Sequence, residues 1–148
     1  MSSLIVPPID DTYRSLGYAL KRAQQAMRSH LDGKLRAVGL TTPQYSVLAG
    51  LEISGGLSNA ELARRAFVTP QTMQAIIVTL ERAGLIERMD HPVHGRVRTT
   101  ELTTAGRTTL RAAHEIAASA EAVARTAVAP ADPESVYSAL LRIAEAMP

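Results

Sequence analysis

Two helix-start signals lie close together near the middle of this chain, and they restrict its fold more than any other feature. The segment SNAE, which begins at Ser58, has the pattern of a capping box: the Ser58 hydroxyl accepts from the Glu61 amide, and the Glu61 carboxylate reaches back to the Ser58 amide. Thr69 followed by Pro70 is a second start signal, because a threonine hydroxyl caps a helix and proline suits its first turn. The sequence therefore predicts a short helix, a tight turn and a longer helix from Thr69.

The segments on either side of this pair predict one more helix and a hairpin. Thr42 and Pro43 mark a helix start by the same logic, and Gly55 ends that helix. Beyond Gly84 the period changes, because LIERM and RVRTTEL favour short strands joined by the turn residues of DHPVHG. Residues 41–103 are therefore expected to hold the elements of a winged helix-turn-helix lobe.

Long amphipathic helices are predicted before and after this lobe. The first is expected from Asp10 or Asp11 to Val38, since its apolar residues recur at steps of three and four. An alanine-rich helix should run from Thr103 to about Val128, and a last amphipathic helix follows it. The expected fold class is mainly α with a small β-hairpin, in a single domain over the 148 residues.

Composition excludes several classes of protein. The chain has no cysteine, which rules out disulfides and thiolate metal sites. Its apolar runs are too short to span a bilayer, and no basic segment leads into an apolar core at the start, so we expect no membrane partner and a cytoplasmic location. No phosphate-binding glycine loop or nucleophile-elbow pattern occurs in the sequence. We therefore expect neither an enzyme with catalytic residues nor a bound cofactor.

The net charge of +2 gives no global argument for binding nucleic acid, but one local patch does. Within residues 88–98, the single acid, Asp90, is outnumbered by basic and imidazole side chains: Arg88, His91, His94, Arg96 and Arg98. Such a patch is the minimum that a phosphate-binding surface requires. We expect DNA-backbone contacts from Ser58, His94, Arg96 and Arg98, with the helix starts adding free amides.

The first turn of the helix after Thr69 is polar but carries no charge. Its outward side chains are expected to be Thr69, Gln71, Thr72 and Gln74, with Met73, Ile76 and Ile77 packed beneath. Glutamine can bond an adenine edge in two places, and threonine can donate, accept or contact a thymine methyl. The pattern therefore predicts base reading in the major groove of double-stranded DNA. The alternative is an ordinary solvated helix start beside ordinary surface charge.

The stretch from LTTPQYSVLAGLEISGG through NAELARRAFVTPQTMQAIIVTLERAGLIER, followed by HGRVRTTELTTAG, resembles the multiple antibiotic resistance regulator (MarR) family of bacterial transcription factors. The resemblance includes the L-T-x-x-G segment at 102–106, and the flanking helices extend it over nearly the whole chain. Two positions depart from the family pattern. His94 stands where an acid is common in the wing, and Ala75 stands where the recognition helix often has arginine.

The resemblance implies a homodimer that binds a palindromic operator, with repression relieved by a small-molecule effector. Residues 1–40 and 104–148 would then form a helical dimerisation region, and their apolar surface exceeds what a lobe of this size needs for its core. The resemblance also implies an effector cleft between these helices and the lobe. Candidate lining residues are Met27, His30, Tyr45 and Leu48.

Two other functions are left open by the residues themselves. A winged-helix module for protein–protein contact without sequence-specific DNA binding is favoured by the small net charge and by the absence of lysine and arginine from Thr69 to Glu81. A metal-responsive regulator is suggested by the His-x-x-His spacing of His91 and His94, but without a third nearby ligand these are more typical of a solvated turn. We therefore expect no metal site.

Overall fold

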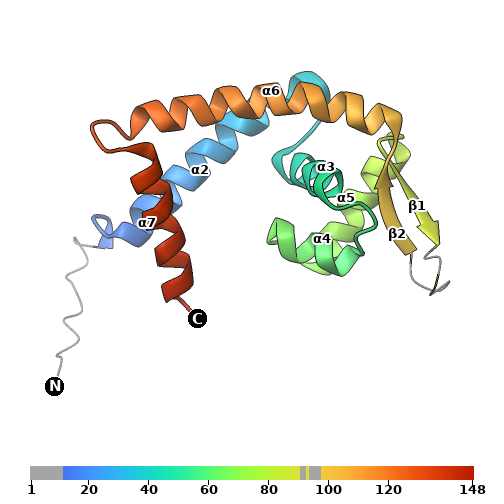
Figure 1. Ribbon diagram of the computed structural model, residues 1–148, viewed down its shortest axis with the longest axis horizontal. Helices are drawn as coiled ribbons and strands as arrows, with labels where there is room; N and C mark the ends of the chain where they lie inside the picture. Colours follow the sequence, from blue (N-terminus) through green and yellow to red (C-terminus); the bar gives the residue numbers. More distant parts are fainter. Residues whose placement is uncertain (1–11, 91–92, 94–97) are drawn as a thin grey trace.

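The computed structural model describes residues 12–90, 93 and 98–148. Its elements in chain order are α2 (Leu16–Leu35), the short 3-10 helix η1 (Arg36–Val38), α3 (Thr42–Ile53), α4 (Asn59–Ala66), α5 (Pro70–Arg82), β1 (Ile86–Asp90), β2 (Arg98–Leu102), α6 (Thr104–Ala127) and α7 (Pro133–Ala146). A lobe of α3, α4, α5 and the hairpin lies beneath one end of α6, whereas α7 descends from its other end (Figure 1). The predicted fold class, mainly helical with a small hairpin, is confirmed.

The two predicted caps in the middle of the chain both form. The Ser58 hydroxyl accepts from the Glu61 amide at 3.3 Å, and the Thr69 hydroxyl accepts from the Thr72 amide at 3.1 Å. The second predicted bond of the capping box has a different donor. The Glu61 carboxylate accepts from the Ser58 hydroxyl, at 3.0 Å, and not from the Ser58 amide. One hydroxyl thus makes both contacts at the start of α4.

The start of α3 differs from the prediction by one residue. Thr41, and not Thr42, is the cap: its amide donates to the Gln44 side-chain oxygen at 3.0 Å, and its hydroxyl accepts from the Gln44 amide. Thr42 is already helical, and its amide donates to the Asp32 carboxylate on α2 at 2.6 Å. This bond links α3 to α2, and it was not predicted from the sequence.

The first long helix begins later than predicted. α2 starts at Leu16, because Ser15 is extended and its hydroxyl accepts from the Tyr18 amide at 3.1 Å, which is the geometry of an N-cap. The predicted start residues Asp10 and Asp11 lie outside the described residues. At the other end the α-helix stops at Leu35 and η1 completes the predicted length.

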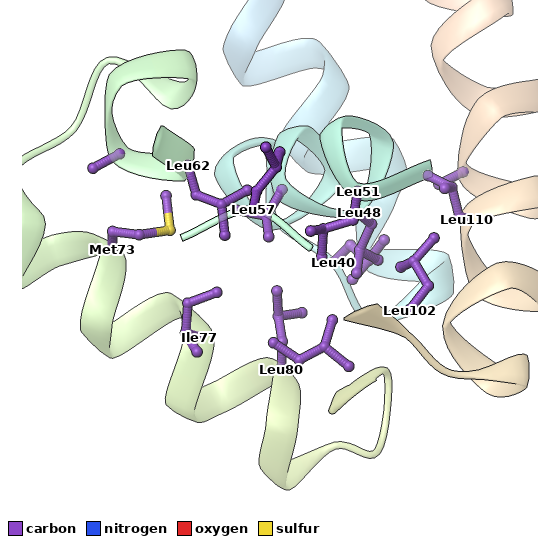
Figure 2. Packing of buried hydrophobic residues seen from close by; sticks show 14 of the residues in the cluster. Leu40, Leu48, Leu51, Leu57, Leu62, Met73, Ile77, Leu80, Leu102 and Leu110 are labelled. Carbon is purple, nitrogen blue, oxygen red and sulfur yellow. The ribbon is translucent and has the colours of Figure 1, made fainter. Parts of the chain in front are cut away.

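The hydrophobic core lies in the lobe and extends to the adjacent parts of α2 and α6 (Figure 2). Buried leucines from α3, α4 and the hairpin meet Met73, Ile77 and Leu80 of α5. Leu110 and Ala113 of α6 are at most 1% exposed, as is Leu35 of α2. The lobe is therefore fixed to both long helices by apolar packing.

The hairpin is paired in antiparallel register from Ile86 with Leu102 to Asp90 with Arg98. The loop before α4 adds a further contact that was not predicted: Leu57 forms an isolated bridge with Thr100, and the Thr100 amide donates to the Leu57 carbonyl at 3.2 Å. A single bridged residue has no periodic pattern, so the sequence does not reveal it.

The L-T-x-x-G segment anchors the start of α6 to the turn that follows α5. The Thr103 hydroxyl accepts from the Gly106 amide at 3.0 Å and donates to the Gly84 carbonyl at 2.6 Å. Gly106 packs so closely that a Cβ there would lie 2.0 Å from the Leu85 carbonyl oxygen. Glycine is therefore required at this position by contact with the backbone.

The apolar surface of the outer helices is largely uncovered. α7 has no buried residue, although it carries Tyr137, Leu140 and Leu141, which are 43–57% exposed. Leu16 of α2 is 75% exposed and Val123 of α6 is 61% exposed. These side chains have the helical spacing of a packed face but little of this chain to pack against.

Candidate DNA-binding surface

α5 separates its side chains into a buried apolar side and an exposed polar start. Met73 and Ile77 are 0% exposed, while Gln71, Thr72 and Gln74 are exposed. The alternation follows from helical geometry, since positions three and four apart share a face. The structure therefore places the predicted base-reading side chains together, outward, at one end of α5.

The threonines at this end are already engaged with each other. The Thr69 hydroxyl caps the helix and donates to the Thr72 hydroxyl at 3.0 Å. The Thr72 hydroxyl proton is therefore free to donate outward, whereas Thr69 has used its proton. Of the two, Thr72 is better placed to reach a base edge.

Asn59 of α4 forms a hydrogen bond with Gln74 of α5. The Asn59 amide donates to the Gln74 side-chain oxygen at 2.6 Å, which leaves the Gln74 amide group as its outward donor. Asn59 could not be predicted from the sequence, because the two residues are fifteen positions apart and their contact depends on the angle between α4 and α5. Gln71 makes no such contact among the described residues, so its amide keeps all its hydrogen-bonding capacity.

The wing contains an acid–arginine pair formed across the hairpin. Arg98 Nε lies 3.9 Å from Asp90 Oδ1, and Arg98 Nη2 donates to the Arg88 carbonyl at 3.4 Å. The two side chains are 55% and 78% exposed, so the pair orients Arg98 more than it stabilises the fold. His94 and Arg96, the other predicted wing contacts, lie outside the described residues, as does His91.

The end of α4 adds two cations that were not predicted from the sequence. Arg64 and Arg65 occupy the last turn of α4 and are exposed, and neither forms an ion pair within the described part of the chain. They stand next to the turn that leads to α5. Ser58, at the opposite end of α4, is half-buried with its hydroxyl committed to Glu61.

The four candidate effector residues occupy different environments. Met27 and His30 are exposed on α2, and Leu48 is 0% exposed in the core. Tyr45 is half-buried at the junction of α3 and α6, where its hydroxyl lies 2.8 Å from His114 Nδ1. Burial raises the pKa of the Tyr45 hydroxyl, and the negative charge of Glu52 raises it further.

His114 joins α6 to α3 through both ring nitrogens. Its Nε2 lies 2.6 Å from the Glu52 carboxylate, and its Nδ1 contacts the Tyr45 hydroxyl. A neutral ring with its proton on Nε2 satisfies both contacts, because Nδ1 then accepts from the tyrosine. This three-residue bridge was not predicted, since its members are far apart in sequence.

The described residues contain no group of three or more histidine, aspartate and glutamate side chains arranged to hold a metal ion. Within the same residues, no helix is long and apolar enough to cross a membrane.

Known proteins resemble this chain in sequence and in structure. Residues 38–97 match the model of the MarR family. The HTH-type transcriptional repressor Rv2887 of Mycobacterium tuberculosis is 39% identical over 107 residues, which cover 72% of this chain and 77% of the relative.

Two solved structures extend the similarity to the whole fold. The transcriptional repressor CouR bound to a 23-mer DNA duplex has a TM-score of 0.83 at 29% identity, covering 93% of this chain and 98% of that one. The Mycobacterium tuberculosis protein Rv2887 in complex with salicylic acid has a TM-score of 0.68 at 33% identity, covering 90% and 96%. Because it is 39% identical to a repressor over most of both chains and shares the fold of the family, this chain belongs to the MarR family of winged helix-turn-helix transcription regulators.

Proposed function

We propose that the chain is a transcriptional repressor that binds a palindromic operator as a homodimer in the cytoplasm and leaves it when a small molecule binds. The observation that carries the proposal is the exposed polar start of α5 above its buried side, with Gln71 and Gln74 outward and Met73 inward. The family supports it, because it is a family of transcription regulators and not of enzymes. The CouR structure, which contains a DNA duplex, supports it as well.

DNA recognition is divided between two kinds of contact in this proposal. Thr69, Gln71, Thr72 and Gln74 read base edges in the major groove, with Asn59 orienting Gln74. Ser58, His94, Arg96 and Arg98 contact the sugar–phosphate backbone and set the register. Arg64 and Arg65 extend the backbone surface at the other edge of the α4–α5 turn.

The dimer is supported by the outer helices. α7 has 14 residues and none of them is buried, and an isolated helix of this length is marginal in water. A second copy that covers its apolar face and those of α2 and α6 stabilises all three. Residues 1–40 and 104–148 are proposed as the dimerisation region, and residues 41–103 as the DNA-binding lobe. Two lobes then meet two half-sites about 34–36 Å apart.

Release by a ligand is proposed as a shift between two separations of the lobes. The salicylic acid in the Rv2887 structure supports a small-molecule effector for a relative of this chain. We place the site where α2, α3 and α6 meet, near Met27, His30, Tyr45 and Leu48. A ligand that prefers a separation unsuited to the operator weakens DNA binding by its differential affinity for the two states.

The test is a gel mobility-shift assay of the purified protein with the DNA upstream of its own coding sequence. It is run at two salt concentrations beside a mixed-sequence duplex of equal length. We expect selective retention of the upstream DNA that persists at the higher salt, where non-specific binding falls steeply. Equal retention of both duplexes, or none, rejects the proposal and favours a winged-helix module that contacts protein.

A further inference from the structure

The turn between α4 and α5 carries an aromatic side chain in an unusual setting. Phe67, the chain's single phenylalanine, is 96% exposed. Its backbone has φ of +55°, and no other non-glycine residue in the described part of the chain has a positive φ. Both features are unfavourable in the free protein, since an L side chain is strained in the left-handed region and an exposed ring orders water.

The backbone of the turn explains the conformation but not the side chain. The Val68 amide donates to the Ala63 carbonyl at 3.1 Å and the Phe67 amide to the Arg64 carbonyl at 3.4 Å, which is the Schellman pattern that ends many helices. This pattern needs a left-handed residue, and glycine or asparagine fills that position with less strain. The phenyl ring contributes nothing to it.

The neighbours of Phe67 belong to the surface proposed to contact DNA. The exposed, unpaired cations Arg64 and Arg65 precede it, and Thr69, the cap of α5, follows two residues later. In the proposed complex, these neighbours would bring the Phe67 ring to the edge of the major groove. The apolar carbon surface available there is the deoxyribose or a thymine methyl.

We propose that Phe67 is a DNA-contacting residue that packs its ring against the apolar carbon surface of the duplex at the edge of the groove. The inference rests on the proposed DNA-binding function and adds a contact to it. The complex removes the ring from water and so offsets the strain that the free protein carries in this turn.

The test compares two variants of the full chain. Phe67→Asn removes the ring and tolerates the left-handed backbone, and Phe67→Leu keeps apolar bulk in the same strained conformation. Dissociation constants for the upstream duplex and for a mixed-sequence duplex are measured by fluorescence anisotropy. Melting temperature and molar mass in solution are measured on the same samples.

We expect Phe67→Asn to bind about tenfold more weakly while its melting temperature stays the same or rises by about 1–4 °C and its molar mass is unchanged. Phe67→Leu should retain most of the affinity. Equal loss on both duplexes assigns the contact to deoxyribose, and loss on the upstream duplex alone assigns it to a thymine methyl.

Unchanged affinity of Phe67→Asn overturns the inference while leaving the proposed function intact. A loss of affinity accompanied by a lower melting temperature or an altered molar mass also overturns it, because the ring then acts through folding or assembly. If the unmodified protein retains neither duplex, the proposed function fails and this inference fails with it.

Discussion

At the start of α5, neighbouring residues differ completely in their exposure. Gln71 and Gln74 carry amides outward, whereas Met73 between them is wholly buried. A polar group in the Met73 position would lack a partner in the core, and an apolar group in the glutamine positions would lose its donors to a base edge. Folding and the proposed DNA recognition therefore use separate side chains of the same turn.

The first prediction concerns the two glutamines. Gln71→Ala should reduce the preference for operator over mixed-sequence DNA by about tenfold or more, because a bidentate amide contact discriminates among bases. Gln74→Ala should reduce it by less, because the Gln74 side-chain oxygen already accepts from Asn59 and only its amide group is left to donate outward. Dissociation constants for both duplexes check this. Thr79→Ala, further along the exposed side of α5, is the matched control and should leave the preference unchanged. Equal loss on every sequence would reject base reading.

The second prediction concerns the wing arginines. Arg98→Ala should weaken operator and mixed-sequence DNA alike and reduce the salt dependence of binding by about one phosphate's share. Arg96→Ala, at a position outside the described residues, should do the same. Binding constants measured over a series of salt concentrations give the slope. Asp90→Asn frees Arg98 from its acid partner, so it should strengthen binding to both duplexes; weaker binding would count against a phosphate contact.

At the scale of elements, the third prediction tests the contact between α6 and the turn after α5. Gly106→Ala places a Cβ 2.0 Å from a backbone carbonyl that has no flexible end to move, so it should destabilise the fold by about 2 kcal/mol or more. Gly33→Ala, in α2 with open space around it, should instead stabilise by about 0.5–1 kcal/mol. Denaturant unfolding measures both, and equal effects would show that helix propensity alone decides.

The fourth prediction uses the bond between α2 and α3. The Thr42 side chain and amide lower the pKa of Asp32, and the charges of Arg28 and Arg36 lower it further. The amide forms the hydrogen bond to Asp32, whereas the Thr42 hydroxyl has no hydrogen-bond partner among the described residues. Since the folded pKa is lowered, the stabilisation is present above the ordinary carboxylate pKa and is lost as pH falls through the folded value.

Asp32→Ala should therefore reduce stability at pH 7 by about 1 kcal/mol, a figure kept small because the carboxylate is partly exposed. The difference from the unmodified protein should shrink as the pH falls through the folded pKa of Asp32. Unfolding by urea at pH 7 and at about pH 3 gives the two differences. A gap that stays constant between them would show that the negative charge plays no part.

The order and type of the elements could be predicted because caps, proline positions and apolar spacing are local. Ser58 and Thr69 define the helix pair without any knowledge of the rest of the chain. Two boundaries were wrong for equally local reasons: Thr41 competes with Thr42 as a cap of α3, and Ser15, which is extended, is the cap of α2.

The contacts of the site could be predicted only in part. Outward glutamines follow from helical spacing, but the Asn59–Gln74 bond and the Tyr45–His114–Glu52 bridge depend on how separate helices cross. Phe67 gave no signal, since a lone aromatic residue normally belongs to a core. Its exposure follows from the three-dimensional course of the turn between α4 and α5, which the sequence does not specify.

At the scale of the whole molecule, the fifth prediction concerns assembly. Leu140→Glu places a charge on the apolar face of α7 and should convert the proposed dimer into a monomer, with loss of operator binding because one lobe covers only half a site. Sedimentation or light scattering gives the molar mass. Ser138→Glu, on the polar side of the same helix, should leave both properties unchanged. A monomeric unmodified protein would contradict the proposal.

α6 begins beside the hairpin, packs against α2 and α3, and ends where the chain turns toward α7 (Figure 1). Its 24 residues make a rod about 36 Å long. Over that length, a tilt of only about 5° carries the far tip through about 3 Å. In the proposed dimer, a slight change in the tilt of α6 where two copies meet would therefore move each DNA-binding lobe by nearly one base-pair step along the double helix.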